Sequence, residues 1–485
     1  MAPNIQTLRQ VFVVSGLTLC SISDGFIFGQ MSGMIDALQK GSSLIELSED
    51  DISAIAATIN ITCFWGFASM VGLTEAFGRR ISLTILSIPV LICWIMVYFA
   101  QDKTVLIASR AIVGLSFGGI TVMTYINIGE YVAPHMRSLC LNIMYSIGTT
   151  LGTMLGHVLS LFLHWRNVAL VGLIPTALSA IIPLFWVESP TWLATHNRLE
   201  ECKQAFYSLH PHSEAAEKEL KMLIEYQINN AKDSNKTSSN FMILLRKYKE
   251  AWKHPYYWKI VIITNIVCLY RVAAGRILLI TLIITIIQDI TGTSDILVYT
   301  LVVDGFALIG AGLSCIFVTK FNMRPLLFCS GIISNTIQTI FAASLYFWQD
   351  GEMAWVKISL LTLYYITVTA GPYSVLETLL TELSPLEIKT MNCMLLGVIS
   401  SVIQFISIQF ATKMFTKIGY HGVFFVNSAI VFLCLLYLYF QLPETKGRTL
   451  QEIEYYFKNN TFREDKNEVD EHERLNKAHD LENKA

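Results

Sequence analysis

Twelve apolar runs, each long enough to cross a bilayer, constrain the fold of this 485-residue chain more than any other feature. A membrane helix needs roughly 20 mostly apolar residues to cross a hydrocarbon core of about 30 Å. The runs lie near residues 10–30, 52–74, 81–100, 105–127, 138–163, 166–187, 258–287, 296–318, 325–347, 355–380, 391–413 and 421–442. We therefore predict an all-α polytopic membrane protein with twelve transmembrane helices.

The amount and placement of charge agree with a membrane protein. Hydrophobic residues make up 53% of the chain and charged residues only 15%, far less charge than a soluble chain of this length carries. The connections "EAFGRRI", "APHMRS", "VTKFNMRP" and "LEIKT" are basic, whereas those between them are acidic or nearly neutral. Basic connections stay on the cytoplasmic side, and an even number of spans puts both ends on one side. We expect an integral protein of the plasma membrane with both termini cytoplasmic.

The chain carries matching motifs in its two halves. After the fourth span, Glu130 is followed by Pro134 and by the cation Arg137, and after the tenth span Glu382 is followed by Pro385 and Lys389, with the cation seven residues beyond the acid in both cases. "FGRR" after the second span is echoed by "FNMR" after the eighth, and "VESPTW" by "LPETKGR". Recurrence in the same order favours a parallel repeat of two six-helix bundles.

This repeat predicts four regions. Residues 1–187 and 257–442 form the two bundles, and residues 188–256 form a cytoplasmic linker. "RLEECKQAFYSLH" and "SEAAEKELKMLIEYQINN" in the linker have the apolar spacing of amphipathic helices, and the polar stretch "KDSNKTSSN" separates them from "FMILLRKYKEAWKHP". The tail, 443–485, is rich in charge beyond about residue 459, where we expect disorder.

Two arginines interrupt the seventh span, where a membrane helix should carry none. A guanidinium at mid-membrane costs about 2.5 to 3.5 kcal/mol on an insertion scale, so each needs a partner or water. Arg271 and Arg276 are five residues apart, which on a straight helix turns them about 140° from one another. Gly275 between them predicts a break in this helix. The buried acids Asp24, Asp304 and Glu377 are the candidate partners, and equally candidate proton sites.

Further motifs lie at the helix ends: "GRR" (78–80), "SRAIVGLSFGG" (109–119), "ESPTWL" (188–193), "ELSP" (382–385) and "PETKGRTLQEIE" (443–454). Together with Glu130, Pro134 and Arg137, they resemble the sugar porter branch of the major facilitator superfamily, which includes facilitative glucose and trehalose carriers. The resemblance implies the superfamily fold, a central cavity between the bundles, and alternating access without covalent chemistry.

We predict that acids and bases of opposite halves bridge at the cytoplasmic helix ends when that side closes. The resemblance places this latch at Gly78, Arg79, Arg80, Arg110, Glu130, Arg137, Glu188, Glu382, Lys389, Glu444 and Arg448.

The chain departs from the family pattern where a sugar would bind. Arg271 stands where the family has the first of two glutamines, and "GPYSV" (371–375) replaces the segment that carries a tryptophan. Met31 stands where proton-driven members carry an aspartate, which favours facilitated diffusion. The residues that we expect to line the cavity are Phe28, Tyr145, Arg271, Asp304, Gln404 and Phe405.

Three functions remain open at this point. The first is a facilitative uniporter of a hexose, trehalose or polyol. The second is a porter of a small organic anion that uses Arg271, and the third is a solute sensor with a degenerate cavity. The chain has no P-loop, nucleophile motif or metal-ligand spacing, so we expect no enzymatic activity, cofactor or metal. A small solute and the lipid bilayer are the expected partners of a monomer, with no nucleic acid.

Overall fold

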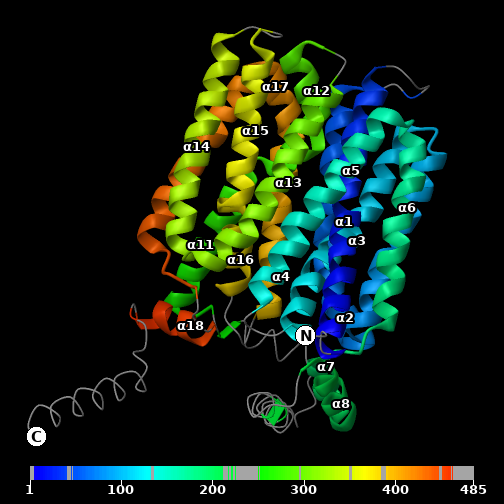
Figure 1. The fold of residues 1–485 in the computed structure, drawn as a ribbon, viewed down its shortest axis with the longest axis vertical. Coiled ribbons are helices and arrows are strands. Elements are labelled where there is room, and N and C mark those ends of the chain that lie inside the picture. The colour runs from blue at the N-terminus through cyan, green and yellow to red at the C-terminus, as the bar shows by residue number, and fades with distance from the viewer. Residues whose placement is uncertain are drawn as a thin grey trace, which may run out of the picture.

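The computed structural model describes most of the chain and, within that part, all regular elements are helices. The described residues are 5–40, 45, 47–132, 136–210, 217, 220, 221, 224, 249, 250, 252–293, 296–348, 352–383, 389–446, 450–459 and 461. Twelve helical segments among them are long and apolar enough to cross a membrane, which confirms the predicted number of spans. The helices run side by side along the long axis of the molecule (Figure 1).

The first six spans use eight helical elements. They are α1 (Ile5–Gln39), α2 (Glu49–Phe99), α3 (Lys103–Tyr131), α4 (Arg137–Asn142), the π-helix η2 (Ile143–Gly148), α5 (Thr149–Phe162), α6 (Trp165–Ile181) and the 3-10 helix η3 (Ile182–Phe185). Helix α2 contains two spans because Gly78, at φ 79° and ψ −174°, turns the chain back. Ser48 caps the start of α2 and accepts a hydrogen bond from the backbone N–H of Asp51.

The last six spans follow the same plan. They are α11 (Pro255–Ala273), α12 (Arg276–Thr291), α13 (Leu297–Lys320), α14 (Met323–Phe347), α15 (Ala354–Ala370), α16 (Pro372–Glu382) and α17 (Lys389–Gln441). Gly419 turns α17 back at φ 70° and ψ 170°, as Gly78 turns α2. The seventh span is α11 and α12 together, and the tenth is α15 and α16.

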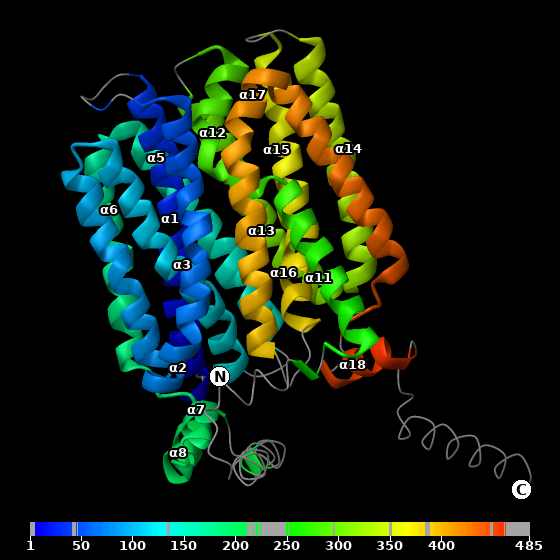
Figure 2. The same ribbon diagram turned by 180° about the vertical axis from the view of Figure 1, so that it is seen from behind.

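The two sets of six spans form two bundles that lie against each other. Helices α1 to α6 occupy one side of the molecule and α11 to α17 the other, as both views show (Figures 1 and 2). They meet where α1 contacts α12, α2 contacts α17, and α5 contacts α13. We call α1 to α6 the N-terminal half and α11 to α17 the C-terminal half.

Close packing of α1 on α5 fixes the wall of the N-terminal half that faces its partner. A Cβ atom on Gly25 would lie 2.1 Å from the carbonyl oxygen of Thr149, and one on Gly152 would lie 2.0 Å from that of Ile22. Small residues let membrane helices approach this closely and gain dispersion contacts. The contact holds in place the face of α5 that carries Thr149, Thr150 and His157.

The connecting helices lie at one end of the bundle. Helices α7 (Pro190–Thr195), α8 (Leu199–Leu209) and α18 (Leu450–Asn459) gather there, and we call this the linker end (Figures 1 and 2). Helix α1 holds α8, because Gln6 and Gln10 donate to the carbonyls of Tyr207 and Leu209. The predicted second amphipathic helix, its polar loop and the charged tail lie outside the described residues, apart from isolated positions.

The outer surface suits a lipid environment. Large apolar side chains face outward along the helices, among them Ile174 at 62% exposure, Ile332 at 60% and Phe432 at 58%. Apolar surface this extensive is rare on soluble monomers. The polar side chains that lie mid-span are instead buried between the helices, where they build the site described next.

Candidate solute site at the interface of the two halves

Gly275 breaks the seventh span as the sequence predicts. It adopts the left-handed conformation, with φ 70° and ψ 10°, between the end of α11 and the start of α12. The straight-helix angle between Arg271 and Arg276 therefore does not apply. Both side chains reach polar groups close to the boundary between the halves.

Arg271 is paired with Glu377. Its Nη1 lies 2.9 Å from Oε1 of Glu377 on α16, and both side chains are largely buried. The other carboxylate oxygen, Oε2, accepts a hydrogen bond of 2.7 Å from the hydroxyl of Tyr125 on α3. Glu377 thus joins a cation of its own half to a tyrosine of the other half. The charge of Arg271 is balanced inside the protein, which removes the main support for an anion site at this residue.

Arg276 has a different environment. Its Nη2 donates to the hydroxyls of Thr149 and Thr150 on α5, at 3.0 and 2.9 Å. Its guanidinium carbon lies 4.4 Å from the centre of the Tyr373 ring, a cation–π contact. The residue is only 5% exposed, and no carboxylate pairs with it among the described residues.

Asp304 pairs with a histidine and not with either arginine. Nδ1 of His157 on α5 lies 2.8 Å from Oδ2 of Asp304 on α13, and Nε2 lies 3.0 Å from the carbonyl oxygen of Ile280 on α12. The carbonyl can only accept, so Nε2 carries a hydrogen, and the contact with Asp304 needs one more proton between Nδ1 and Oδ2. With that proton the pair is electrically neutral. His157 therefore links the N-terminal half to two helices of the C-terminal half.

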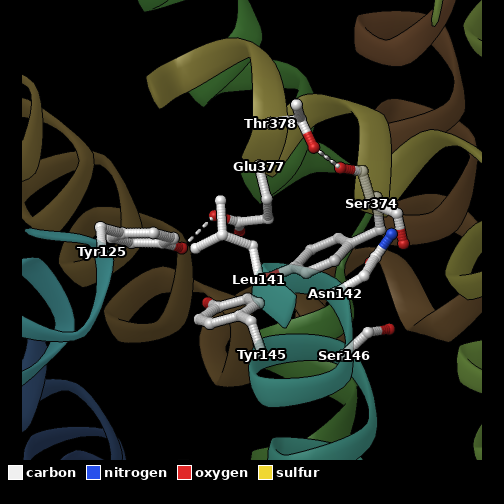
Figure 3. Close-up of a pocket in the computed structure, with 9 residues that line it drawn as sticks. Tyr125, Leu141, Asn142, Tyr145, Ser146, Ser374, Glu377 and Thr378 are labelled. Carbon is white, nitrogen blue, oxygen red and sulfur yellow. Dashed lines mark hydrogen bonds between the residues drawn. The ribbon is translucent and has the colours of Figure 1, made fainter. Parts of the chain in front are cut away.

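Hydroxyl and amide groups line a small pocket beside these pairs. Tyr145 and Tyr373 stack across the interface with ring centres 6.3 Å apart and planes 10° apart. Figure 3 shows Tyr125 pointing at Glu377, with Tyr145 below them. The full lining is Tyr125, Leu141, Asn142, Tyr145, Ser146, Tyr373, Ser374, Glu377 and Thr378. The remaining room, about 10 Å³, is roughly that of one water molecule, so the site is closed in this structure.

A second, larger cavity lies at the end of the bundle opposite the linker end. It measures about 210 Å³ and is lined by both halves, from Ile35 and Gln39 of α1 to Leu282 and Asp289 of α12. An exposed ion pair between Lys413 and Asp50, 2.9 Å long, also connects the halves, through α17 and α2. The cavity lies between the same two bundles as the closed pocket.

Only some of the residues that the sequence predicts to line the cavity lie at the interface of the two halves. Tyr145 lines the pocket, and Arg271 and Asp304 lie in the networks described above. Phe28 instead packs edge-on against Phe117 inside the N-terminal half. Gln404 and Phe405 lie on α17, and neither belongs to the residues that line these two cavities.

Two positions of α1 bear on proton coupling. Met31 is fully buried, and Asp24 is buried without an ion pair in the described part of the chain. Asp24 is therefore not the partner of either arginine.

The charged residues near the linker end form a network within the N-terminal half. The guanidinium of Arg79 donates to both oxygens of Glu130, at 2.9 and 2.8 Å, and the hydroxyl of Ser189 donates to the same carboxylate. Glu188 accepts from the backbone N–H of Arg79 at 2.8 Å. Glycine suits position 78 because a side chain is strained at its φ of 79°, and a Cβ atom would also crowd the carboxylate of Glu188, 2.6 Å from Oε2.

The C-terminal half contains two contacts of the same kind. Glu444 accepts from the backbone N–H groups of Met323 and Arg324, both at 3.0 Å, as Glu188 accepts from that of Arg79. Arg80 donates to the carbonyl of Trp186 at 2.7 Å, and Arg324 donates to that of Tyr439 at 2.7 Å.

The predicted latch between the halves differs from what the structure shows. Glu130, Glu188 and Glu444 all bind partners of their own half. Glu130 accepts from the side chains of Arg79 and Ser189, whereas Glu188 and Glu444 accept from backbone N–H groups just after Gly78 and Asn322. Arg137 donates to the carbonyl of Val132, also within its half. Glu382 ends α16 and is partly buried, while the side chain of Lys389 and the whole of Arg448 lie outside the described residues.

Arg110 is a core residue and not a gate at the helix ends. It is fully buried in α3, and its Nη2 donates to the amide oxygen of Gln30 at 2.8 Å. Within the described part of the chain, its Nε and Nη1 have no hydrogen-bond partner.

Sequence reasoning missed several residues of the site. His157 is an ionisable side chain inside a span, the same signal that singled out the two arginines. Tyr125, Tyr373 and Asn142 carry no such signal, since tyrosine and asparagine also occur in membrane helices for packing and capping. Only the arrangement of the helices identifies them as lining residues.

The comparison with known proteins decides the family. The model of the family "Sugar (and other) transporter" matches residues 10–457, almost the entire chain. The chain belongs to this family. As a member of the sugar transporter family, it is similar to the facilitated trehalose transporter Tret1 of Polypedilum vanderplanki, with 21% identity over 93% of this chain and 88% of that protein. It is also similar to the sugar transporter ERD6-like 6 of Arabidopsis thaliana, with 25% identity over 94% of this chain and 91% of that protein.

Solved structures share the fold of this sugar transporter family member. The proton:xylose symporter XylE of E. coli, a protein of the major facilitator superfamily, superposes with a TM-score of 0.77. The match has 16% identity and covers 93% of this chain and 100% of that one. The chain therefore has the major facilitator fold, as predicted from its motifs, and it is a transporter by family and not an enzyme.

Proposed function

We propose that the protein carries a small polar solute of the sugar class across the membrane as a facilitative uniporter, by alternating access between its two halves. The observation that carries the proposal is the pocket between the halves, whose lining holds the hydroxyls of Tyr125, Tyr145, Tyr373 and Ser374 and the amide of Asn142. Hydroxyls and amides donate and accept, as do the hydroxyls of a sugar. Relatives named as trehalose and sugar transporters support this class of solute.

Uniport is proposed because the first span lacks the acid expected of a proton-driven member. Met31 occupies that place, and a thioether cannot carry a proton. The neighbouring Gln30 is neutral and serves as acceptor for the buried Arg110. XylE, which shares the fold, is named a proton symporter, but a shared fold does not transfer the mode of coupling.

Alternating access requires contacts that form and break between the halves. Several polar links meet this description, and three of them lie at the buried interface: Tyr125 to Glu377, Arg276 to the pair of threonines on α5, and His157 to Asp304. A solute that enters between the halves must replace or separate these links. The cost of separating them is met only if the solute offers comparable hydrogen bonds.

Uptake of labelled solutes by cells that lack endogenous sugar transport tests the proposal. The panel contains hexoses, trehalose, polyols and sugar acids, and each is measured with and without a proton uncoupler. We expect saturable uptake of at least one compound, and the uncoupler should not reduce it. No uptake from the whole panel would contradict transport of this class, and loss of uptake with the uncoupler would contradict uniport.

We further propose that the linker end faces the cytoplasm at the plasma membrane, which the basic connections at this end support. Epitope tags at either terminus should be reached by antibody only after permeabilisation. Labelling of intact cells would show that the termini lie outside the cell, which would contradict the proposed orientation.

A further inference from the structure

Arg276 is the one cation at the interface whose charge no described carboxylate balances. Arg271 is neutralised by Glu377 at 2.9 Å, and Asp304 is engaged with His157 at 2.8 Å. Because the contacts of His157 require a shared proton, the pair with Asp304 is neutral and offers Arg276 no compensating charge. Among the ion pairs and polar links at this interface, Arg276 thus contributes a positive charge that no described carboxylate offsets.

The guanidinium of Arg276 also keeps unused donor capacity. Nη2 donates to two threonine hydroxyls, but Nη1 is buried and has no hydrogen-bond partner among the residues that the structure describes. A buried donor that lacks a partner costs free energy, and a buried unpaired charge costs more. Such a group in a membrane span is a functional candidate by default.

The backbone adds to the positive character of this spot. Arg276 is the first residue of the 16-residue helix α12, and Gly275 before it provides no side-chain cap. The first N–H groups of a helix lack intrahelical acceptors and carry the positive end of the helix dipole. Broken membrane helices present this end to the anionic groups of their substrates.

We propose that the solute is a monoanion, a carboxylate on a hydroxylated carbon skeleton such as a sugar acid, and that its carboxylate binds Arg276. The inference rests on the proposed transport function and names its substrate class. In the closed state, the hydroxyls of Thr149 and Thr150 occupy Nη2 of Arg276. The carboxylate replaces them there and also reaches Nη1, while the hydroxyls of the skeleton face Tyr145 and Asn142.

A carboxylate at this position would make a bidentate pair with the guanidinium. Arginine suits planar carboxylates because two parallel N–H groups meet two oxygens. Binding would both neutralise the charge of Arg276 and release its link to α5, which holds the two halves together. Occupation of the site is thereby coupled to separation of the halves, as a substrate-driven carrier requires.

Purified protein in liposomes provides the direct test, with gluconate and glucuronate as probes and glucose and sorbitol as their neutral counterparts. We expect the acids to be taken up and to raise the apparent melting temperature of the protein more than the neutral compounds. An imposed potential that is positive inside should drive accumulation of the acid, because uniport of a monoanion moves one charge per cycle. The potential should not affect a neutral solute.

Two substitutions separate charge from fold. Arg276→Gln keeps a donor for the threonines but removes the charge, and we expect roughly 10- to 100-fold weaker binding of gluconate, the loss of a charge-assisted hydrogen bond. Arg276→Lys keeps the charge and should retain most of the preference for the acid. Arg166→Gln is the matched control, since Arg166 also stacks on an aromatic ring, that of Trp165, but lies away from the pocket.

The outcomes distinguish this inference from the proposed function. If the wild type carries glucose or sorbitol and neither binds nor carries the acids, the inference is overturned while sugar transport stands. If the acids fail to stabilise the purified protein, the inference is overturned whatever is transported. If Arg276→Gln binds gluconate as tightly as the wild type and Arg166→Gln do, the carboxylate does not bind Arg276.

Discussion

Nη1 of Arg271 lies 2.9 Å from Oε1 of Glu377, and this buried pair accounts for the most unusual feature of the seventh span. Removing one partner of a buried pair leaves an uncompensated charge, which costs about 3 to 5 kcal/mol. We therefore expect Glu377→Ala to lower the apparent melting temperature of the purified protein strongly.

The double variant Arg271→Met with Glu377→Met should be closer to the wild type than Glu377→Ala, because replacing both charges by apolar groups of similar size is often neutral. It still loses the hydrogen bond that Tyr125 donates to Glu377. A double-mutant cycle on the melting temperatures of Arg271→Met, Glu377→Met and the double variant measures this coupling. If the effects of the two single changes simply add, the pair does not interact in the folded protein.

The sequence predicts the fold well because apolar length and helix-end motifs are local signals. The sequence predicts the twelve spans and the break at Gly275, and it includes Glu377 among the candidate partners of Arg271. It does not predict the partners of Glu130, because a charge at a helix end can bind within its half or across to the other. Only the turn at Gly78, which places Arg79 beside Glu130, shows that Glu130 binds within its own half.

The links between the halves were equally out of reach. His157 and Asp304 are 147 residues apart, and Arg276 and Thr149 are 127 apart. Hydrophobic periodicity defines which residues form a helix, but it does not define which faces of two distant helices meet. The polar residues of the pocket are therefore known only once the two bundles are placed against each other.

The bridge from His157 to Asp304 should make stability depend on pH. Both hydrogen bonds of the histidine exist only while the shared proton is present, so their contribution is complete at low pH and falls as pH rises. An amide in place of the carboxylate can donate to Nδ1 without this proton. In Asp304→Asn, position 304 and His157 should therefore stay hydrogen-bonded. The stability of this variant should lose the part of its pH dependence that comes from the shared proton.

The test compares the melting temperatures of the wild type and Asp304→Asn as pH is varied. A range of roughly pH 5 to 9 surrounds the ordinary titration of histidine. Asp304→Ala serves as control, and we expect it to be less stable than both at low pH by about 1 to 3 kcal/mol, because His157 loses its partner. Parallel pH curves for the wild type and Asp304→Asn would contradict the shared proton.

Gly78 should be among the least tolerant positions near the linker end. At φ 79° and ψ −174° a side chain is strained, and a Cβ atom would lie 2.6 Å from Oε2 of Glu188. We expect Gly78→Ala to cost about 1 to 3 kcal/mol in strain and to weaken the hydrogen bond from the N–H of Arg79 to Glu188.

Gly72→Ala is the matched control in the same helix, because nothing lies within 4 Å of its Cβ position. It should be neutral or slightly stabilising, since alanine favours a helix over glycine. Thermal unfolding and uptake of both variants can be measured side by side. Equal tolerance of the two substitutions would show that the turn does not depend on glycine.

Substitutions of Tyr125 and Tyr145 can separate the contact between the two halves from the binding of the solute. The hydroxyl of Tyr125 donates to Glu377 across the two halves at 2.7 Å, so Tyr125→Phe should cost about 1.5 to 3 kcal/mol, the value of a hydrogen bond to a charged group. The ring of Tyr145 stacks on Tyr373 and keeps that contact as phenylalanine. Tyr145→Phe should therefore leave the melting temperature nearly unchanged and raise KM for the transported solute. The reverse pattern, with stability lost in Tyr145→Phe and unchanged in Tyr125→Phe, would mean that the link to Glu377 does not hold the halves together.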